Sequence, residues 1–117
     1  MFDLFGDLAP STLTRPDGTQ LALLSAEPDE RRGTVLAVHG FTGAKEDFLF
    51  LLPELAHHGW TATAVDLRGV HQSTSPGPFD LDTLAADLCA VARDLGGPVH
   101  LVAHSFGGLS AQRAVIA

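Results

Sequence analysis

The chain has 117 residues, of which 45% are hydrophobic and 18% charged, and its formal net charge is −7. This length and composition predict one folded domain, and the acidic balance argues against nucleic acid or an anionic membrane as a partner. The chain has no apolar run that could cross a membrane, no basic leader, and a single cysteine, so we expect a cytoplasmic protein without an internal disulfide.

The first part of the chain predicts a short arm and a hairpin. We expect residues 1–11 to be an N-terminal arm, loose or forming one short turn, and the domain to occupy residues 12–117. Two short runs, Leu13–Arg15 and Leu21–Ser25, flank a Pro-Asp-Gly sequence at 16–18. Proline, aspartate and glycine in this order favour a tight turn, so the two runs are predicted to pair as a β-hairpin.

The middle of the chain alternates between strand and helix patterns. Thr34–Val38 is a β-branched apolar run without alternation, which is typical of a strand covered on both faces. Lys45–His58 has apolar residues at helical spacing, and Pro53 predicts either a kink or a first turn that begins near it. Thr61–Val65 predicts a further strand, and the prolines and glycine within 70–78 predict a loop.

The last part of the chain repeats this alternation. Leu81–Leu95 has an amphipathic helical pattern, with Asp80 or Asp82 as its expected N-cap. Val99–Ala103 predicts a short strand, and two glycines then lead into a last helix. A hairpin followed by alternating strands and helices predicts an α/β fold, a mostly parallel sheet with helices on both faces. Sites in such sheets form at the carboxyl ends of the strands.

Three motifs lie at these strand ends. They are His39-Gly40-Phe41-Thr42-Gly43, Asp66-Leu67-Arg68-Gly69 with Ser73 shortly after, and Ala103-His104-Ser105-Phe106-Gly107-Gly108. A serine at a sharp turn from a strand into a helix, with small residues two positions to either side, is typical of a nucleophile elbow. In chain order the motifs resemble the HGxxG oxyanion loop, the DxRGxGxS segment and the nucleophile elbow of the α/β-hydrolase family. The resemblance covers residues 12–117 and only the N-terminal half of the family's fold.

The resemblance implies an esterase-like serine hydrolase that acts on an ester or related acyl bond of a small-molecule substrate. Ser105 would be the nucleophile, and the backbone N–H groups of Phe41 and Phe106 would stabilise the oxyanion. No organic cofactor is implied, and no ligand cluster has the spacing of a metal site. The resemblance assigns supporting roles to His39, Gly40, Gly43, Asp66, Arg68, His104 and Gly107.

The supporting residues have individual expected roles. We expect His39 to brace the oxyanion loop by hydrogen bonds and His104 to be a packing residue. Asp66 and Arg68 are expected to brace the loop after their strand, as an ion pair, rather than to take part in catalysis. His71 stands where the family pattern has its second glycine. Because it lies on a strand-end loop, it is the one histidine that we consider as a substitute base.

The acid and base of a triad are missing after Ser105. The twelve residues that follow it include no His, Asp or Glu, whereas both groups follow the nucleophile in this family. We expect an α/β-hydrolase domain truncated after the nucleophile helix, with strand 99–103 left as an unprotected edge and no hydrolytic activity in isolation. The chain would be a fragment, one half of a split protein completed by another chain or by a homo-oligomer, or a non-catalytic remnant that binds a ligand or partner. A dinucleotide-binding domain is disfavoured because no GxGxxG follows the first parallel strand.

Overall fold

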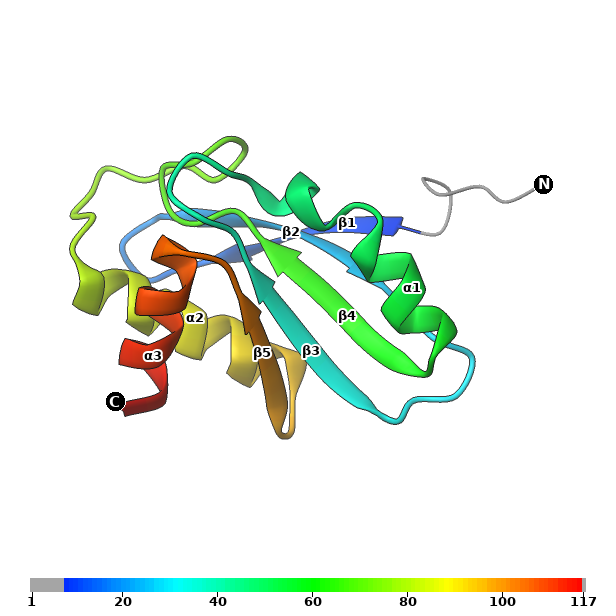
Figure 1. Cartoon of the computed structure of the whole chain (residues 1–117). Coiled ribbons are helices and arrows are strands. Elements are labelled where there is room, and N and C mark those ends of the chain that lie inside the picture. Colours follow the sequence, from blue (N-terminus) through cyan, green and yellow to red (C-terminus); the bar gives the residue numbers. More distant parts are fainter. Residues whose placement is uncertain (1–7, 117) are drawn as a thin grey trace.

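The computed structural model describes residues 8–116 as a five-stranded mixed sheet with helices on both faces (Figure 1). In chain order the elements are β1 (Leu8–Thr14), β2 (Gln20–Ala26), β3 (Gly33–Val38), the 3-10 helix η1 (Lys45–Phe48), α1 (Leu51–His57), β4 (Trp60–Val65), α2 (Leu81–Leu95), β5 (Val99–Ala103) and α3 (Phe106–Ile116). The strand order is β1-β2-β4-β3-β5, in which β1, β2 and β4 pair antiparallel and β4, β3 and β5 pair parallel. The predicted hairpin and parallel sheet are confirmed.

The two faces of the sheet are packed with side chains of different size. On the face covered by α2 and α3 the buried strand residues are large, namely Leu21, Leu23, Leu36, Val38 and Val65. On the face covered by α1 they are small and pack around Leu52 of α1, namely Ala26, Ala37, Ala62 and Ala64. Successive strand residues point to opposite faces, so one set of strands supports two hydrophobic layers.

The first strand is longer than the sequence predicts. β1 pairs with β2 along its whole length, so residues 8–11 of the expected arm are part of the sheet, and residues 1–7 lie outside the described residues. β1 is an edge strand with mostly exposed side chains, which explains the absence of apolar alternation there. An edge position also tolerates Pro10, which has no backbone N–H to donate.

The predicted helix over 45–58 is two helices. η1 ends at Phe48, and α1 begins at Leu51 with Pro53 in its first turn, so of the two expectations for this proline the second is confirmed. α2 has the predicted bounds, and Asp80 caps it by accepting a hydrogen bond from the Thr83 N–H at 2.9 Å. Among residues 8–116, no helix combines the length and the apolar character that a membrane crossing requires.

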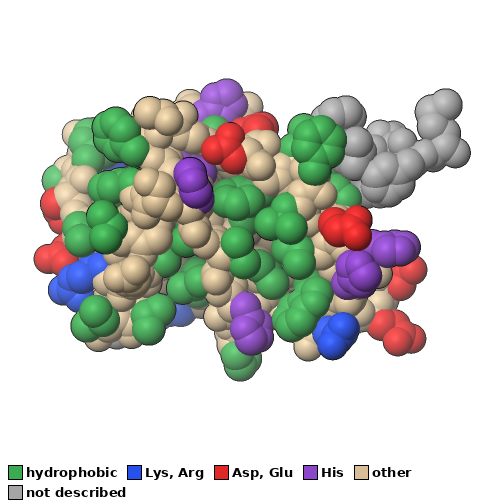
Figure 2. Space-filling view, in the orientation of Figure 1, with side chains coloured by type: hydrophobic (Ala, Val, Ile, Leu, Met, Phe, Trp, Pro, Cys, Tyr) green, Lys and Arg blue, Asp and Glu red, His purple; other side chains and the backbone are tan. Residues whose placement is uncertain are grey.

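β5 forms the other edge of the described sheet. It pairs only with β3 among residues 8–116. Val102 lies opposite Ala37 of β3, on the α1 face, and is 41% exposed. Figure 2 shows hydrophobic side chains gathered over this face of the sheet, beside α1. The described part of the chain therefore presents an open apolar edge at β5.

Candidate active site

The three motifs meet at the carboxyl ends of the parallel strands. The loop after β3 begins at His39, the loop after β4 begins at Asp66, and β5 leads into Ser105. Because β4, β3 and β5 are parallel neighbours, their carboxyl ends lie side by side. There the N–H of His104 donates to the Val38 carbonyl at 3.0 Å, which joins the turn after β5 to the end of β3.

Ser105 occupies a strained turn between β5 and α3. Its φ of 54° lies in the left-handed region that residues with a side chain rarely adopt, and the residue is exposed. The turn closes because position 107 is glycine. A Cβ at Gly107 would overlap the His39 carbonyl oxygen and lie 2.7 Å from that of Val38. A serine held in this way between a strand and a helix has the backbone geometry of a nucleophile elbow.

The loop after β3 lies directly against this turn. A Cβ at Gly40 would be 2.9 Å from Nδ1 of His104, and the Gly43 N–H donates to the Gly40 carbonyl at 3.1 Å. The rings of Phe41 and Phe106 meet edge to face with centroids 5.9 Å apart. Within residues 8–116 the backbone N–H groups of these two phenylalanines donate no hydrogen bond, so both donors remain available.

The buried ring of His39 joins the loops after β3 and β4. Its Nε2 accepts a hydrogen bond from the Leu67 N–H at 3.0 Å. Nδ1 therefore carries the proton and donates to the Gly40 carbonyl at 2.6 Å. With both ring nitrogens engaged, His39 has none left to accept a proton from Ser105.

The carboxylate of Asp66 is fully buried, and its charged partner is Lys45 rather than Arg68. Oδ1 accepts from the Lys45 backbone N–H at 2.7 Å, and Oδ2 lies 2.8 Å from the Lys45 ammonium. The expected ion pair between Asp66 and Arg68 is therefore wrong. Each of the two charges instead meets a partner from another element. The first residue of η1 is Lys45, whereas α2 and the β1–β2 turn supply the carboxylates around Arg68.

Arg68 is 3% exposed and forms a bidentate ion pair with Asp87 of α2. The two hydrogen bonds are 2.6 and 2.9 Å long, and a third runs from Nη1 to Asp17 at 3.0 Å. The bonds to Asp87 raise the pKa of Arg68 above its usual value, although burial opposes them. Arg15 of the hairpin also contacts Asp87, at 3.0 Å. This network fixes the loop after β4 to α2 and to the hairpin.

Sequence reasoning missed Lys45 and Asp87. Asp87 had a signal, because it is a charged residue on the apolar stripe of α2 between Leu84 and Leu88. Lys45 had none, since it follows a glycine-rich loop where a charged side chain is usually solvated. Burial acts to lower the pKa of Lys45, but hydrogen bonds to Asp66 and Glu46 outweigh it and the pKa is raised.

One group of side chains has atoms close enough to share a metal ion. A ligand atom from each of Glu46, Asp66 and His71 lies within 4.8 Å of the others. However, the Lys45 ammonium contacts both carboxylates, at 2.9 Å from Glu46 and 2.8 Å from Asp66. A cation at this position would have to displace that ammonium. We therefore interpret the group as an ion-pair network around Lys45.

Two further histidines lie in the segments after β4 and β5. His71 has a φ of 49°, which explains why glycine suits this position in the family pattern, and its Nε2 lies 3.6 Å from Glu46. Its ring thus belongs to the network around Lys45. His104 is exposed, with its ring over Gly40. The expected packing role of His104 stays a prediction, because the ring contacts the loop after β3 at Gly40 while the residue as a whole is exposed.

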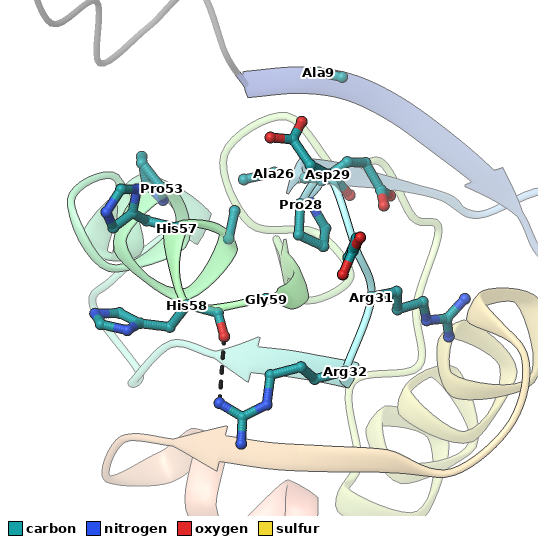
Figure 3. A pocket seen from close by; sticks show the side chains of 14 residues that line it. Ala9, Ala26, Pro28, Asp29, Arg31, Arg32, Pro53, His57, His58 and Gly59 are labelled. Carbon is teal, nitrogen blue, oxygen red and sulfur yellow. Dashed lines mark hydrogen bonds between the residues drawn. The ribbon is translucent and has the colours of Figure 1, made fainter.

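A large cavity lies at the other end of the sheet. It measures about 1060 Å³ and is lined by the connector between β2 and β3 and by the end of α1 (Figure 3). There the Arg32 guanidinium donates to the His58 carbonyl at 3.5 Å. β3 and β4 begin beside this cavity, whereas the three motifs follow their carboxyl ends. Its size therefore does not make it the candidate active site.

Comparisons with known proteins agree with this geometry. Ethanol acetyltransferase 1 of Wickerhamomyces ciferrii is 36% identical over 75 residues, which cover 62% of this chain and 19% of the acetyltransferase. An epoxide hydrolase from Vigna radiata superposes with a TM-score of 0.85 at 24% identity, over 96% of this chain and 37% of that one. A thioesterase domain from the curacin biosynthetic pathway gives 0.79 at 27% identity, over 89% and 38%.

The two solved structures share the fold of this chain, and the names of the three relatives describe different reactions. The chain spans less than two fifths of the length of both solved structures. The family model described as "Alpha/beta hydrolase family" matches residues 35–117, a stretch that begins in β3 and includes all three motifs. The chain therefore belongs to the alpha/beta hydrolase family.

Proposed function

We propose that this chain carries the nucleophile and the oxyanion hole of a serine hydrolase that cleaves an ester or a related acyl bond. Ser105 attacks the carbonyl carbon, and its proton passes to a general base as the tetrahedral intermediate forms. The leaving alcohol takes that proton, and water then hydrolyses the acyl-serine. The observation that carries the proposal is the left-handed backbone of Ser105 in an exposed turn packed against the loop after β3.

The proposed oxyanion donors are the backbone N–H groups of Phe41 and Phe106. The ring centroids of these two phenylalanines are 5.9 Å apart, so the two segments that carry the N–H groups are neighbours. Within residues 8–116 neither N–H group donates another hydrogen bond. His39, Lys45 and Asp66 support the loop that presents the Phe41 N–H, so the donor needs little reorganisation during the reaction. One such donor contributes about 3–4 kcal/mol of barrier lowering in serine hydrolases.

The general base and the acid that orients it are proposed to come from outside residues 106–117, which include no His, Asp or Glu. Asp66 is unsuited to the role of the acid because it already forms a buried pair with Lys45. The identity of the nucleophile also separates the proposal from an epoxide-opening reaction, since the epoxide hydrolases of this family use aspartate at the elbow.

The test is hydrolysis of p-nitrophenyl acetate by the product of the complete reading frame that contains these residues. We expect Ser105→Ala to reduce kcat/KM by about 10⁴-fold or more, because the nucleophile is lost. Ser110→Ala, which removes a buried hydroxyl on the next turn of α3, is the matched control and should retain activity. Equal rates for Ser105→Ala and the unaltered protein would contradict the proposal and favour a non-catalytic binding domain.

The 117-residue chain by itself gives a second comparison. We expect it to hydrolyse p-nitrophenyl acetate no faster than its own Ser105→Ala variant, since among residues 8–116 no side chain is hydrogen-bonded to the Ser105 hydroxyl. A serine-dependent rate in this chain would place the base inside it, with His71 as the residue to substitute next.

A further inference from the structure

A second, smaller cavity lies beside the proposed oxyanion donors. It measures about 290 Å³, at the low end of the range for small-molecule sites. Its wall is formed by the loops after β3 and β4, the start of α2 and the first residue of α3. The apolar side chains that line it are Phe41, Leu67, Val70, Phe79, Leu84 and Phe106.

The two polar side chains of this wall are already satisfied. His39 uses one ring nitrogen on the Leu67 N–H and the other on the Gly40 carbonyl. The Arg68 guanidinium is bound by Asp87 and Asp17. The cavity therefore offers no free side-chain charge or hydrogen bond to a group that enters it, and a charged or strongly polar group would be desolvated there without compensation.

Phe79 forms the outer wall of this cavity. It precedes α2 and is 56% exposed. A Cβ at Gly69 would lie 2.6 Å from its ring, so the ring rests directly on the loop after β4. Because Phe79 is not part of either buried core cluster, its truncation should change the cavity with little effect on folding.

Two of the lining residues are also the proposed oxyanion donors. Phe41 and Phe106 present their backbone N–H groups to the reacting carbonyl in the proposed function, and their rings line the cavity. On the basis of that proposed function, we infer that the cavity binds an uncharged, apolar substituent of the substrate, next to the scissile carbonyl, and that Phe79 determines its preferred size. The substituent belongs to either the acyl or the alcohol side of the ester.

The experiment measures kcat/KM for two ester series with the product of the complete reading frame. p-Nitrophenyl acetate, propionate and butyrate vary the acyl side, whereas methyl, ethyl and propyl acetate vary the alcohol side. In one series kcat/KM should rise about fourfold per methylene, the value for burying one CH₂ group. In Phe79→Ala that rise should fall below about twofold per methylene.

Phe50→Ala is the matched control, since Phe50 is 67% exposed and lies before α1, outside the cavity. It should retain the chain-length dependence of the unaltered protein. A dependence that is absent in both series, or unchanged in Phe79→Ala, would overturn the inference. The proposed function would survive that result if hydrolysis of the shortest esters still requires Ser105. Loss of the serine requirement would instead reject the proposed function itself.

Discussion

The loops after β3 and β4 and the β5–α3 segment contribute to the same site, but they are held in place differently. In the loop after β4 and in η1, which follows the loop after β3, Asp66, Arg68 and Lys45 are buried, and each binds a residue of another element. In the β5–α3 segment Val102 and Leu109 are 41% and 53% exposed. The turn at Ser105 depends on a close backbone approach rather than on buried charges. The proposed oxyanion side of the site is therefore braced by buried charged groups within residues 8–116, and the proposed nucleophile side by a close approach of backbones.

The largest effect should come from removing a charge on the braced side. Arg68→Met leaves the buried carboxylate of Asp87 without its bidentate partner, and loss of one member of a buried pair costs about 3–5 kcal/mol. Arg15, which stays 3.0 Å from Asp87, should keep the loss near the lower value. The measurement is the free energy of unfolding in guanidinium chloride.

The same substitution on the exposed side provides the control. Arg113 of α3 pairs with Asp82 at 2.7 Å, but both side chains are more than one third exposed. Arg113→Met should therefore cost about 0–1 kcal/mol. Similar losses for the two variants would show that the two sides of the site do not differ in the way that burial indicates.

A smaller effect is expected at the elbow, where glycine permits a close contact between backbones. Gly107→Ala places a methyl group against the carbonyl oxygens of Val38 and His39, which belong to the backbone and cannot rotate away. We expect a loss of about 1–3 kcal/mol, the usual range for overpacking. Because the turn must open, Ser105-dependent hydrolysis should also fall.

Gly108→Ala is the matched variant, one residue further along α3. A Cβ at Gly108 has no neighbour within 4 Å, so this variant should be neutral or more stable by about 0.5–1 kcal/mol through helix propensity. Unfolding free energies of both variants, measured in parallel, separate the close contact from the general effect of replacing glycine in a helix. Equal stability of the two would contradict the role assigned to position 107.

Sequence patterns were informative where the structure depends on local or periodic features. Most strands and helices followed from apolar spacing, and the sharp turn at Ser105 followed from the small residues around it. The partners of buried charges did not follow, because Lys45 and Asp66 are 21 residues apart and only the folded loops bring them together. The full extent of β1 was also missed, since an exposed edge strand needs no apolar alternation.

The outer end of the Arg68 network is Asp17, in the turn between β1 and β2. The N–H and hydroxyl of Thr19, and then Arg68, hold the pKa of Asp17 at about 2, below its ordinary value of 3.8. Because the pKa of Asp17 is lower in the folded state than in the unfolded state, its charge stabilises the protein at pH values above the unfolded-state pKa. This stabilisation is lost as the pH falls through the folded-state pKa. Asp17→Asn should therefore have a lower Tm than the unaltered protein at pH 7.

The Tm difference between these two proteins should shrink as the pH falls from about 4 to about 2. Asp29→Asn, in the exposed connector after β2, serves as the control for the loss of one negative charge. We expect this effect to be smaller than those of Arg68→Met and Gly107→Ala, because solvent competes for the Asp17 carboxylate, which is 40% exposed. A Tm difference that stays constant down to pH 2 would mean that Asp17 does not contribute its charge to the braced side of the site.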